Sequence, residues 1–324
     1  MEKELLKHLE FLTAIRPFRH WGNLDSLAKA ANYIENEFKS YGLSITHQKW
    51  NYGKFEYTNI IASYNPQLKK RLIIGAHYDV YLNQPGADDN TSGVAGLLLL
   101  AKQIAEKKPD LLYGIDFVSF CLEEPPHFGT KNMGSYIHAE SLYANKTPVI
   151  GMICLDMIGY FSDAPNSQQY PDKNLVNILP SVGNYIAVIG LKKHAAFSKQ
   201  ITKGMKEKGG IDVQLINFPT TDGLAGLSDH RNYWHFGYDA VMINDTAKLR
   251  NPNYHKITDT IDTLNLEKMN AVVQCLFNVI SKPITPNTQP TEMRNPEEPA
   301  APKKDRLGFI NRLLLWFRNW KWFK

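Results

Sequence analysis

Acidic and histidine residues gather in five short clusters along this chain, and four of the clusters lie just past an apolar run. The clusters are His77-Tyr78-Asp79, Asp88-Asp89-Asn90, Glu123-Glu124, Asp156 and Asn253-Tyr254-His255. Imidazole nitrogens and carboxylate oxygens are ligands of catalytic zinc, and a further carboxylate could act as a general base. If the clusters converge in space, they predict a hydrolytic centre that holds two divalent metal ions.

Short apolar runs precede most of these clusters and predict buried strands. The runs span residues 71–76, 115–122, 149–155 and 240–243. Asp89 instead precedes a helix predicted over Thr91–Lys107, which Thr91 or Ser92 would cap. In open α/β sheets ligands bind beyond the carboxyl ends of the strands, so all five clusters are expected at one edge of a sheet.

Strands and helices alternate along the rest of the chain. Further strands are predicted near residues 45–52, 55–63, 185–189 and 213–216, and further helices near residues 5–15, 24–41, 131–144, 193–206, 227–235 and 266–280. This alternation implies crossover connections between parallel strands. The predicted fold class is therefore α/β, with a mixed, mainly parallel sheet sandwiched by helices in one domain over residues 1–280.

The composition changes after residue 280. Six prolines punctuate a polar stretch over residues 281–304, which predicts an extended linker. Residues 305–324 form a tail that is aromatic, apolar and basic at once. Such a tail could lie in a membrane interface, or it could dock on the enzyme or on a partner, and its pattern leaves both alternatives open.

Composition otherwise describes an ordinary globular protein. The 324 residues are 43% hydrophobic and 21% charged, and the formal net charge of +5 falls partly on the basic tail, so no nucleic-acid partner is expected. Cys121, Cys154 and Cys275 are predicted to be buried free thiols, as in a reducing compartment. The charged N-terminus does not look like a signal peptide. We expect a cytoplasmic protein, peripheral at the membrane if its tail binds there.

Each candidate residue also has a less specific interpretation. A single histidine at a strand end is usually a surface or hydrogen-bonded residue, and Asp89 alone would be a helix cap or a turn residue. The Glu123-Glu124 pair alone would be solvated. Asp156 is harder to dismiss, because apolar residues flank it on both sides and a buried carboxylate needs a partner.

Five motifs in order make the pattern specific. They are Gly75-Ala76-His77-Tyr78-Asp79, Gly86-Ala87-Asp88-Asp89-Asn90-Thr91-Ser92-Gly93, Glu123-Glu124, Leu155-Asp156-Met157-Ile158-Gly159, and Tyr254-His255 followed by Asp259-Thr260. Over roughly residues 20–280 the chain resembles the M28 family of metallopeptidases, the co-catalytic di-zinc aminopeptidases. The resemblance implies a phosphorylase/hydrolase-like α/β sandwich.

The resemblance also implies a role for each residue. Asp89 would bridge two zinc ions, with His77 and Asp156 completing one site and Glu124 and His255 the other. Glu123 would be the general base that takes the proton from the attacking water. Asp79 would accept a hydrogen bond from the second ring N–H of His77 and so fix its tautomer. The Asp89–Asn90 peptide bond is expected to be cis.

Two segments leave the role of a histidine open. After the Glu pair the family usually has a glycine-containing turn, whereas this chain has Pro125-Pro126-His127-Phe128-Gly129-Thr130. His127 could contact substrate or simply sit on a rigid turn. In Ser228-Asp229-His230, His230 could line the site, or Ser228 and Asp229 could start a helix.

The predicted function is that of a zinc-dependent exopeptidase acting on peptides, most plausibly an aminopeptidase. The same ligands also accept cobalt or manganese. The first alternative is a glutaminyl-cyclase-like acyltransferase that uses one zinc ion. The second is an inactive binding module on a peptidase scaffold. The preferred side chain, and whether an amine or a carboxylate anchors the substrate, stay open.

Overall fold

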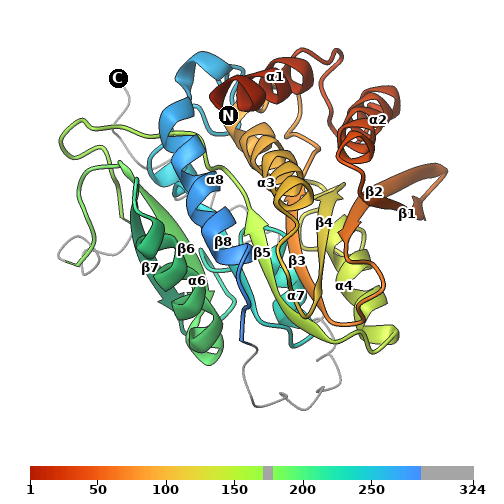
Figure 1. Cartoon of the computed structure of the whole chain (residues 1–324). Coiled ribbons are helices and arrows are strands. Elements are labelled where there is room, and N and C mark those ends of the chain that lie inside the picture. The colour runs from red at the N-terminus through yellow and green to blue at the C-terminus, as the bar shows by residue number, and fades with distance from the viewer. Residues whose placement is uncertain (171–177, 286–324) are drawn as a thin grey trace.

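The computed structural model describes residues 1–170 and 178–285, and its centre is an eight-stranded sheet (Figure 1). The strands are β1 (Ser44–Tyr52), β2 (Phe55–Tyr64), β3 (Arg71–His77), β4 (Gly114–Phe120), β5 (Val149–Leu155), β6 (Tyr185–Leu191), β7 (Asp212–Phe218) and β8 (Ala240–Asn244). Their order across the sheet is β1-β2-β4-β3-β5-β8-β6-β7.

The four central strands run parallel to one another. β4 pairs with β3, β3 with β5 and β5 with β8, all in parallel. The β1–β2 hairpin joins β4 through an antiparallel pairing, and β6 pairs antiparallel with β8 and parallel with β7. Because β3, β4, β5 and β8 point the same way, their carboxyl ends meet at one edge of the sheet.

Helices cover both faces of the sheet, as the sequence predicted. Their bounds are α1 (Glu2–Thr13), α2 (Leu24–Ser40), α3 (Gly93–Lys107), α4 (Gly134–Ala144), α6 (Ala195–Lys208), α7 (His230–His235) and α8 (Leu266–Ile280). Short helical turns are η1 (Ala87–Ser92), η2 (Lys192–His194), η3 (Ala247–Leu249) and η4 (Ile261–Thr263). The helices α1, α2, α3, α6 and α8 lie on one face, and α4 and α7 lie on the other (Figure 1). The predicted α/β class is confirmed.

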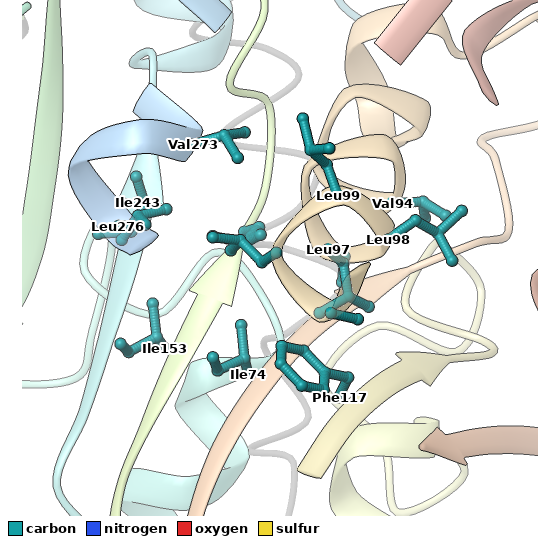
Figure 2. Close-up of a cluster of buried hydrophobic side chains, with 14 of the residues drawn as sticks. Ile74, Val94, Leu97, Leu98, Leu99, Phe117, Ile153, Ile243, Val273 and Leu276 are labelled. Atoms are coloured by element: carbon teal, nitrogen blue, oxygen red, sulfur yellow. The ribbon is translucent and has the colours of Figure 1, made fainter. Parts of the chain in front are cut away.

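Alternate residues of each central strand face the two helical layers. In β3, Ile74 packs into the core under α3 and α8, while Ile73 packs into the core under α4 and α7. Figure 2 shows Ile74, Phe117 and Ile153 below Leu97 of α3, and Ile243 beside Leu276 of α8. Full burial of each such side chain stabilises the fold by about 1.5–3 kcal/mol, so the sheet is a firm platform for the edge that carries the site.

Four predicted helices begin later than the sequence pattern suggested, among them α6, which begins at Ala195 rather than residue 193. α3 begins at Gly93 rather than Thr91, α4 at Gly134 rather than residue 131, and α7 at His230 rather than residue 227. Ahead of α3, the predicted caps do not form, because the Thr91 hydroxyl donates to the Gly86 carbonyl and the Ser92 hydroxyl to the Asp88 carbonyl. Both side chains instead stabilise the wide turn η1, which carries Asp89.

The N-terminal segment braces the loop that follows β3. The Arg19 side chain is buried, and its guanidinium donates hydrogen bonds to the carbonyls of Leu12, Tyr78 and Pro85 and to the hydroxyl of Thr91. This one side chain therefore joins the end of α1 to both ends of the segment between β3 and α3.

Other predictions meet the structure unevenly. All three cysteines are buried free thiols, as predicted. No helix in the described part of the chain is long and apolar enough to cross a membrane. The basic tail over residues 305–324 and all but the first residues of the predicted linker lie outside the described residues.

Candidate metal centre

Five predicted ligands converge at the carboxyl edge of the central strands. His77 is the last residue of β3, Asp156 directly follows β5, and Glu124 lies in the turn after β4. Asp89 comes from η1, and His255 comes from the loop between η3 and η4. Parallel strands that end at a common edge bring these residues together, although 178 positions separate His77 from His255.

Two groups of three ligand atoms share Asp89. The inner triad is His77, Asp89 and Asp156, and the outer triad is Asp89, Glu124 and His255; within each, the ligand atoms lie within 4.8 Å of one another. Nε2 of His77 is 3.4 Å from Oδ1 of Asp89, and Nε2 of His255 is 3.2 Å from Oδ2 of Asp89. Asp89 therefore presents one carboxylate oxygen to each triad, which is the geometry that a bridging ligand needs.

Polar atoms in both triads have no hydrogen-bond partner. Nε2 of His77 and Oε1 of Glu124 are buried and form no hydrogen bond with any described residue. Leaving such a group unsatisfied costs about 1–3 kcal/mol, and a bound cation would satisfy both. Imidazole with carboxylates is also a donor set that suits zinc, so the residues present fit divalent metal ions.

The electrostatics of the site point the same way. Burial, reinforced by the Asp89 carboxylate, raises the pKa of Glu124 to about 7, and burial raises the pKa of Asp156 to about 6. Burial alone would lower the pKa of His255, yet its hydrogen bonds to Asp89 and Glu124 raise it to about 10. Raised pKa values of both the carboxyl groups and the imidazole indicate that the site holds more negative than positive charge.

Glu123, the predicted base, lies beside His77 of the inner triad and lines an adjoining pocket. Its Oε2 is 3.8 Å from Nε2 of His77, and Glu123 with His77 and Glu124 forms a third group of potential ligands. Burial raises the pKa of the Glu123 carboxyl well above its ordinary value. The side chain is thus close enough to exchange a proton with a group held at the triads.

Asp79 supports the site differently from the prediction. Nδ1 of His77 contacts the backbone carbonyl of Asp79 at 3.1 Å, whereas the Asp79 carboxylate lies 3.6 Å away. That carboxylate instead accepts hydrogen bonds from the backbone N–H groups of Glu123 and Glu124, each at 3.1 Å. Asp79 therefore orients His77 through its main chain and the Glu123-Glu124 turn through its side chain.

Asp259 makes the equivalent contact on η1, and its role was not predicted. The two oxygens of its carboxylate accept hydrogen bonds from the backbone N–H groups of Asp88, at 2.9 Å, and Asp89, at 3.1 Å. In η1 and in the Glu123-Glu124 turn, a buried carboxylate therefore accepts hydrogen bonds from two consecutive backbone N–H groups. The motif Tyr254-His255 followed by Asp259 was the one sequence signal that could have revealed this role.

Asn90 ties η1 to the inner triad. The Asp89–Asn90 peptide bond is cis, as predicted. The Asn90 side-chain amide donates to the carbonyl of Leu155, and its oxygen accepts from the N–H of Met157. Asn90 thus fixes η1 against the end of β5, on both sides of Asp156.

An apolar pocket opens beside the triads. Its polar end is formed by Asp89, Glu123, Glu124, Asp156 and His255. Most of the remaining wall comes from β6, β7, β8 and nearby loops, through Met157, Tyr170, Leu179, Ile189, Ile216, Phe218, Leu224, Leu227, Met242 and Leu249, with Lys248 and Tyr254 at its side. The pocket can therefore hold an apolar group next to the clustered ligands.

The two undecided histidines lie outside this pocket. His127 is buried, and its ring makes T-shaped contacts with Trp21 and Tyr52, so it belongs to the turn and not to the pocket wall. His230 is also buried, with Nε2 2.7 Å from the carbonyl of Ala225. Asp229 occupies the cap position of α7, yet its carboxylate is buried and makes no hydrogen bond within the described residues.

Comparisons with known proteins identify the family of the chain. Residues 59–280 match the family model "Peptidase family M28". The chain is 39% identical over 286 residues to "Uncharacterized protein YfbL" of Escherichia coli (strain K12), covering 86% of this chain and 87% of that protein.

Solved structures share the fold at lower identity. LapA aminopeptidase of Legionella pneumophila matches with a TM-score of 0.69 and 20% identity, over 87% of this chain and 71% of LapA. Glutaminyl cyclase of Bacteroides thetaiotaomicron matches with a TM-score of 0.63 and 20% identity, over 86% of this chain and 96% of that chain. The family match covers most of the chain and includes all five predicted ligands, and the chain therefore belongs to peptidase family M28.

Proposed function

We propose that this protein is a zinc-dependent exopeptidase that releases amino-terminal residues from peptides. The observation that carries the proposal is the pair of triads sharing Asp89 at the polar end of an apolar pocket. A peptide whose terminal side chain fills the pocket would place its first peptide bond over the triads. The family and its aminopeptidase members support the hydrolytic assignment.

The chain's own residues would divide the work between holding and proton transfer. His77 and Asp156 would hold one zinc ion, Glu124 and His255 the other, and Asp89 both. When bound, the two ions would supply Lewis acidity to the scissile carbonyl and to the attacking water.

Glu123 would move the proton. Its carboxylate would accept a proton from the attacking water and deliver it to the nitrogen of the leaving amine. Asp79 would keep Glu123 in place through the hydrogen bond from the Glu123 N–H. The buried, apolar surroundings of the pocket would exclude competing water.

An amino terminus suits the polar end of the pocket better than a carboxyl terminus. Four carboxylates, from Asp89, Glu123, Glu124 and Asp156, line that end. Their charge would balance that of two zinc ions, so this end would offer no net positive charge to hold the carboxylate of a substrate. The Glu123 carboxylate, which would ligate neither ion, could accept a hydrogen bond from a free α-amine.

The test is a panel of aminoacyl chromogenic substrates assayed with the full-length protein replete with zinc. We expect release from substrates with apolar side chains, loss of release after treatment with chelator, and recovery when zinc is returned. N-acetylated substrates are the matched control and should not be cleaved. Metal-replete protein that releases nothing from any free-amine substrate would contradict the proposal.

A glutaminyl-cyclase activity is the second candidate, favoured by the similarity to the solved Bacteroides enzyme. That reaction would consume peptides with amino-terminal glutamine and release ammonia. Metal analysis separates the two candidates, because one zinc ion per chain together with ammonia release would favour the cyclase. Two ions per chain with amino acid release would favour the aminopeptidase.

A further inference from the structure

The two triads are supported unequally. In the inner triad, His77 ends a central strand and its side chain is only 1% exposed. In the outer triad, His255 comes from a loop, adopts a positive φ of 57°, and has a side chain that is 22% exposed. The outer triad thus depends on a histidine whose backbone is held by no strand.

The hydrogen bond that usually orients a ligand histidine is present on only one side. Nδ1 of His77 contacts the Asp79 carbonyl at 3.1 Å. Within residues 1–170 and 178–285, Nδ1 of His255 has no hydrogen-bond partner. Ligand histidines ordinarily donate from the second ring nitrogen, and loss of that partner weakens metal binding. No described residue therefore orients the His255 ring through its second nitrogen.

Two tyrosine rings enclose His255. The Tyr81 ring stacks on it with centroids 4.1 Å apart and planes inclined by 12°, and the Tyr254 ring stacks with centroids 3.8 Å apart and planes inclined by 17°. In this position Nε2 of His255 lies 3.2 Å from Oδ2 of Asp89 and 3.3 Å from Oε2 of Glu124. The stacked rings restrict rotation of the imidazole about its side-chain bonds and keep Nε2 aimed at the other ligands.

Tyr81 is the more informative of the two rings. Tyr254 lines the apolar pocket and would also contact substrate, whereas Tyr81 is not part of the pocket wall. Tyr81 belongs to the segment that joins His77 and Asp79 to η1, so the segment that starts at one triad also supports the other.

We propose that Tyr81 is a positioning residue for the outer metal site. Its stacking on His255 supports the affinity of that site, which lacks the second-nitrogen contact present at His77 and binds its ion more weakly than the inner site. This inference rests on the proposed two-metal function. It assigns to the chain one tightly held ion and one that exchanges more readily, with Tyr81 controlling the second.

The test is a zinc titration of the metal-free, full-length protein by calorimetry, with metal analysis after gel filtration. The variants are Tyr81→Ala and Tyr81→Phe, with His255→Ala as the reference that lacks the outer site. Phe11→Ala is the matched control, because Phe11 stacks on Tyr33 in the same way, 3.9 Å between centroids and 11° between planes, but on helices α1 and α2.

We expect Tyr81→Ala to retain the tight ion with unchanged affinity and to bind the second ion about tenfold more weakly, in the range seen when a group supporting a metal ligand is removed. Tyr81→Phe keeps the ring and should bind both ions normally, as should Phe11→Ala. With cobalt in place of zinc, the spectral change at the second equivalent should require a higher cobalt concentration in Tyr81→Ala only.

Two results would overturn the assignment to Tyr81. One is a Tyr81→Ala variant with normal affinity for the second ion, and the other is an equal loss of affinity for both ions. Binding of a single ion by the unaltered protein would instead refute the two-metal function, and the outer site with it, before any variant is compared.

Discussion

Buried charged groups lie at both ends of strand β3, but only those at its start have their hydrogen bonds satisfied by one another. At its start, Arg71 donates two hydrogen bonds to the Asp116 carboxylate, which also accepts one from Ser63. At its end, His77 faces Asp89, Glu123 and Asp156, and its Nε2 has no hydrogen bond with a described residue.

The difference lies in how charge and hydrogen bonding are balanced. The Arg71–Asp116 pair joins one cation to one anion with well-directed hydrogen bonds, so it is complete without any ligand. The end at His77 gathers several carboxylates with two imidazoles and leaves ligand atoms unsatisfied. Burial alone therefore does not mark a functional site, whereas burial with an unbalanced donor set does.

The largest effect is expected at the His77 end of β3, where a substitution should lower turnover and leave the stability of the fold unchanged. Glu123→Gln keeps the size of the side chain but cannot take a proton, so turnover should fall by roughly 10²–10⁴-fold while both metal ions remain. Turnover on an aminoacyl substrate and metal content are measured on the same sample. Glu106→Gln, on the surface of α3, is the control. Loss of metal from Glu123→Gln would mean that Glu123 is a ligand.

The second-largest effect is expected at the Arg71 end of β3, where a substitution should lower the stability of the fold and leave turnover of the folded protein unchanged. Arg71→Met leaves the buried Asp116 carboxylate unpaired and should lower the free energy of unfolding by about 3–5 kcal/mol. The exposed pair Lys49–Glu56 is the control, and Lys49→Met should cost less than about 1 kcal/mol. Denaturant unfolding of metal-loaded protein measures both. A stable Arg71→Met variant would remove the contrast between the two ends.

Replacing the two carboxylates that hold the ligand-bearing turns should give a smaller and selective effect. Asp259→Asn loosens Asp89, which both triads share, so both ions should bind about 10–100-fold more weakly. Asp79→Asn loosens Glu124 and should weaken mainly the outer ion. Zinc titration of the two variants side by side decides, and identical losses at both ions in Asp79→Asn would contradict this division.

The smallest effect is expected from acidification, which should lower the free energy of unfolding through two buried histidines outside the site, His8 and His138. Burial lowers the pKa of His8 and of His138 to about 4. The folded-state pKa of each histidine lies below the unfolded value of about 6.5. The contribution of each neutral histidine to the free energy of unfolding is therefore fully present above pH 6.5 and is lost as the pH falls toward 4. Each should cost about 1–2 kcal/mol by pH 5.

The measurement for these histidines is the free energy of unfolding between pH 7 and pH 5 in the metal-free protein. His138→Gln should make the loss over this range shallower than in the unaltered protein. A slope that His138→Gln leaves unchanged would show that His138 is not a buried neutral group.

The sequence predicted the strands from local pattern, and it predicted that the clusters of acidic and histidine residues converge because most of them follow those strands. Apolar runs predicted β3, β4, β5 and β8, and parallel strands necessarily end at one edge. The contacts that refine the site join distant segments. Asp259 reaches Asp88 across 171 positions, and no local spacing reports that distance.

The remaining differences have similar physical causes. Asp79 was expected to accept a hydrogen bond from His77 because the family resemblance implies it, but its carboxylate accepts from the two backbone N–H groups of the turn after β4. The stack of Tyr81 on His255 depends on how two loops meet. Helix α3 begins two residues late because the hydroxyls of Thr91 and Ser92 bond to backbone carbonyls within η1.

Arg19, in the segment between α1 and α2, links the N-terminal part of the chain to the loop that follows β3. The match to the family model begins at residue 59, well after Arg19. A fragment trimmed to that segment would lose the guanidinium that holds Tyr78, Pro85 and Thr91, and would expose the apolar surface that Leu5, Leu9 and Leu12 cover. The segment from α1 to α2 therefore supports the loop that carries Asp89 as well as covering the core.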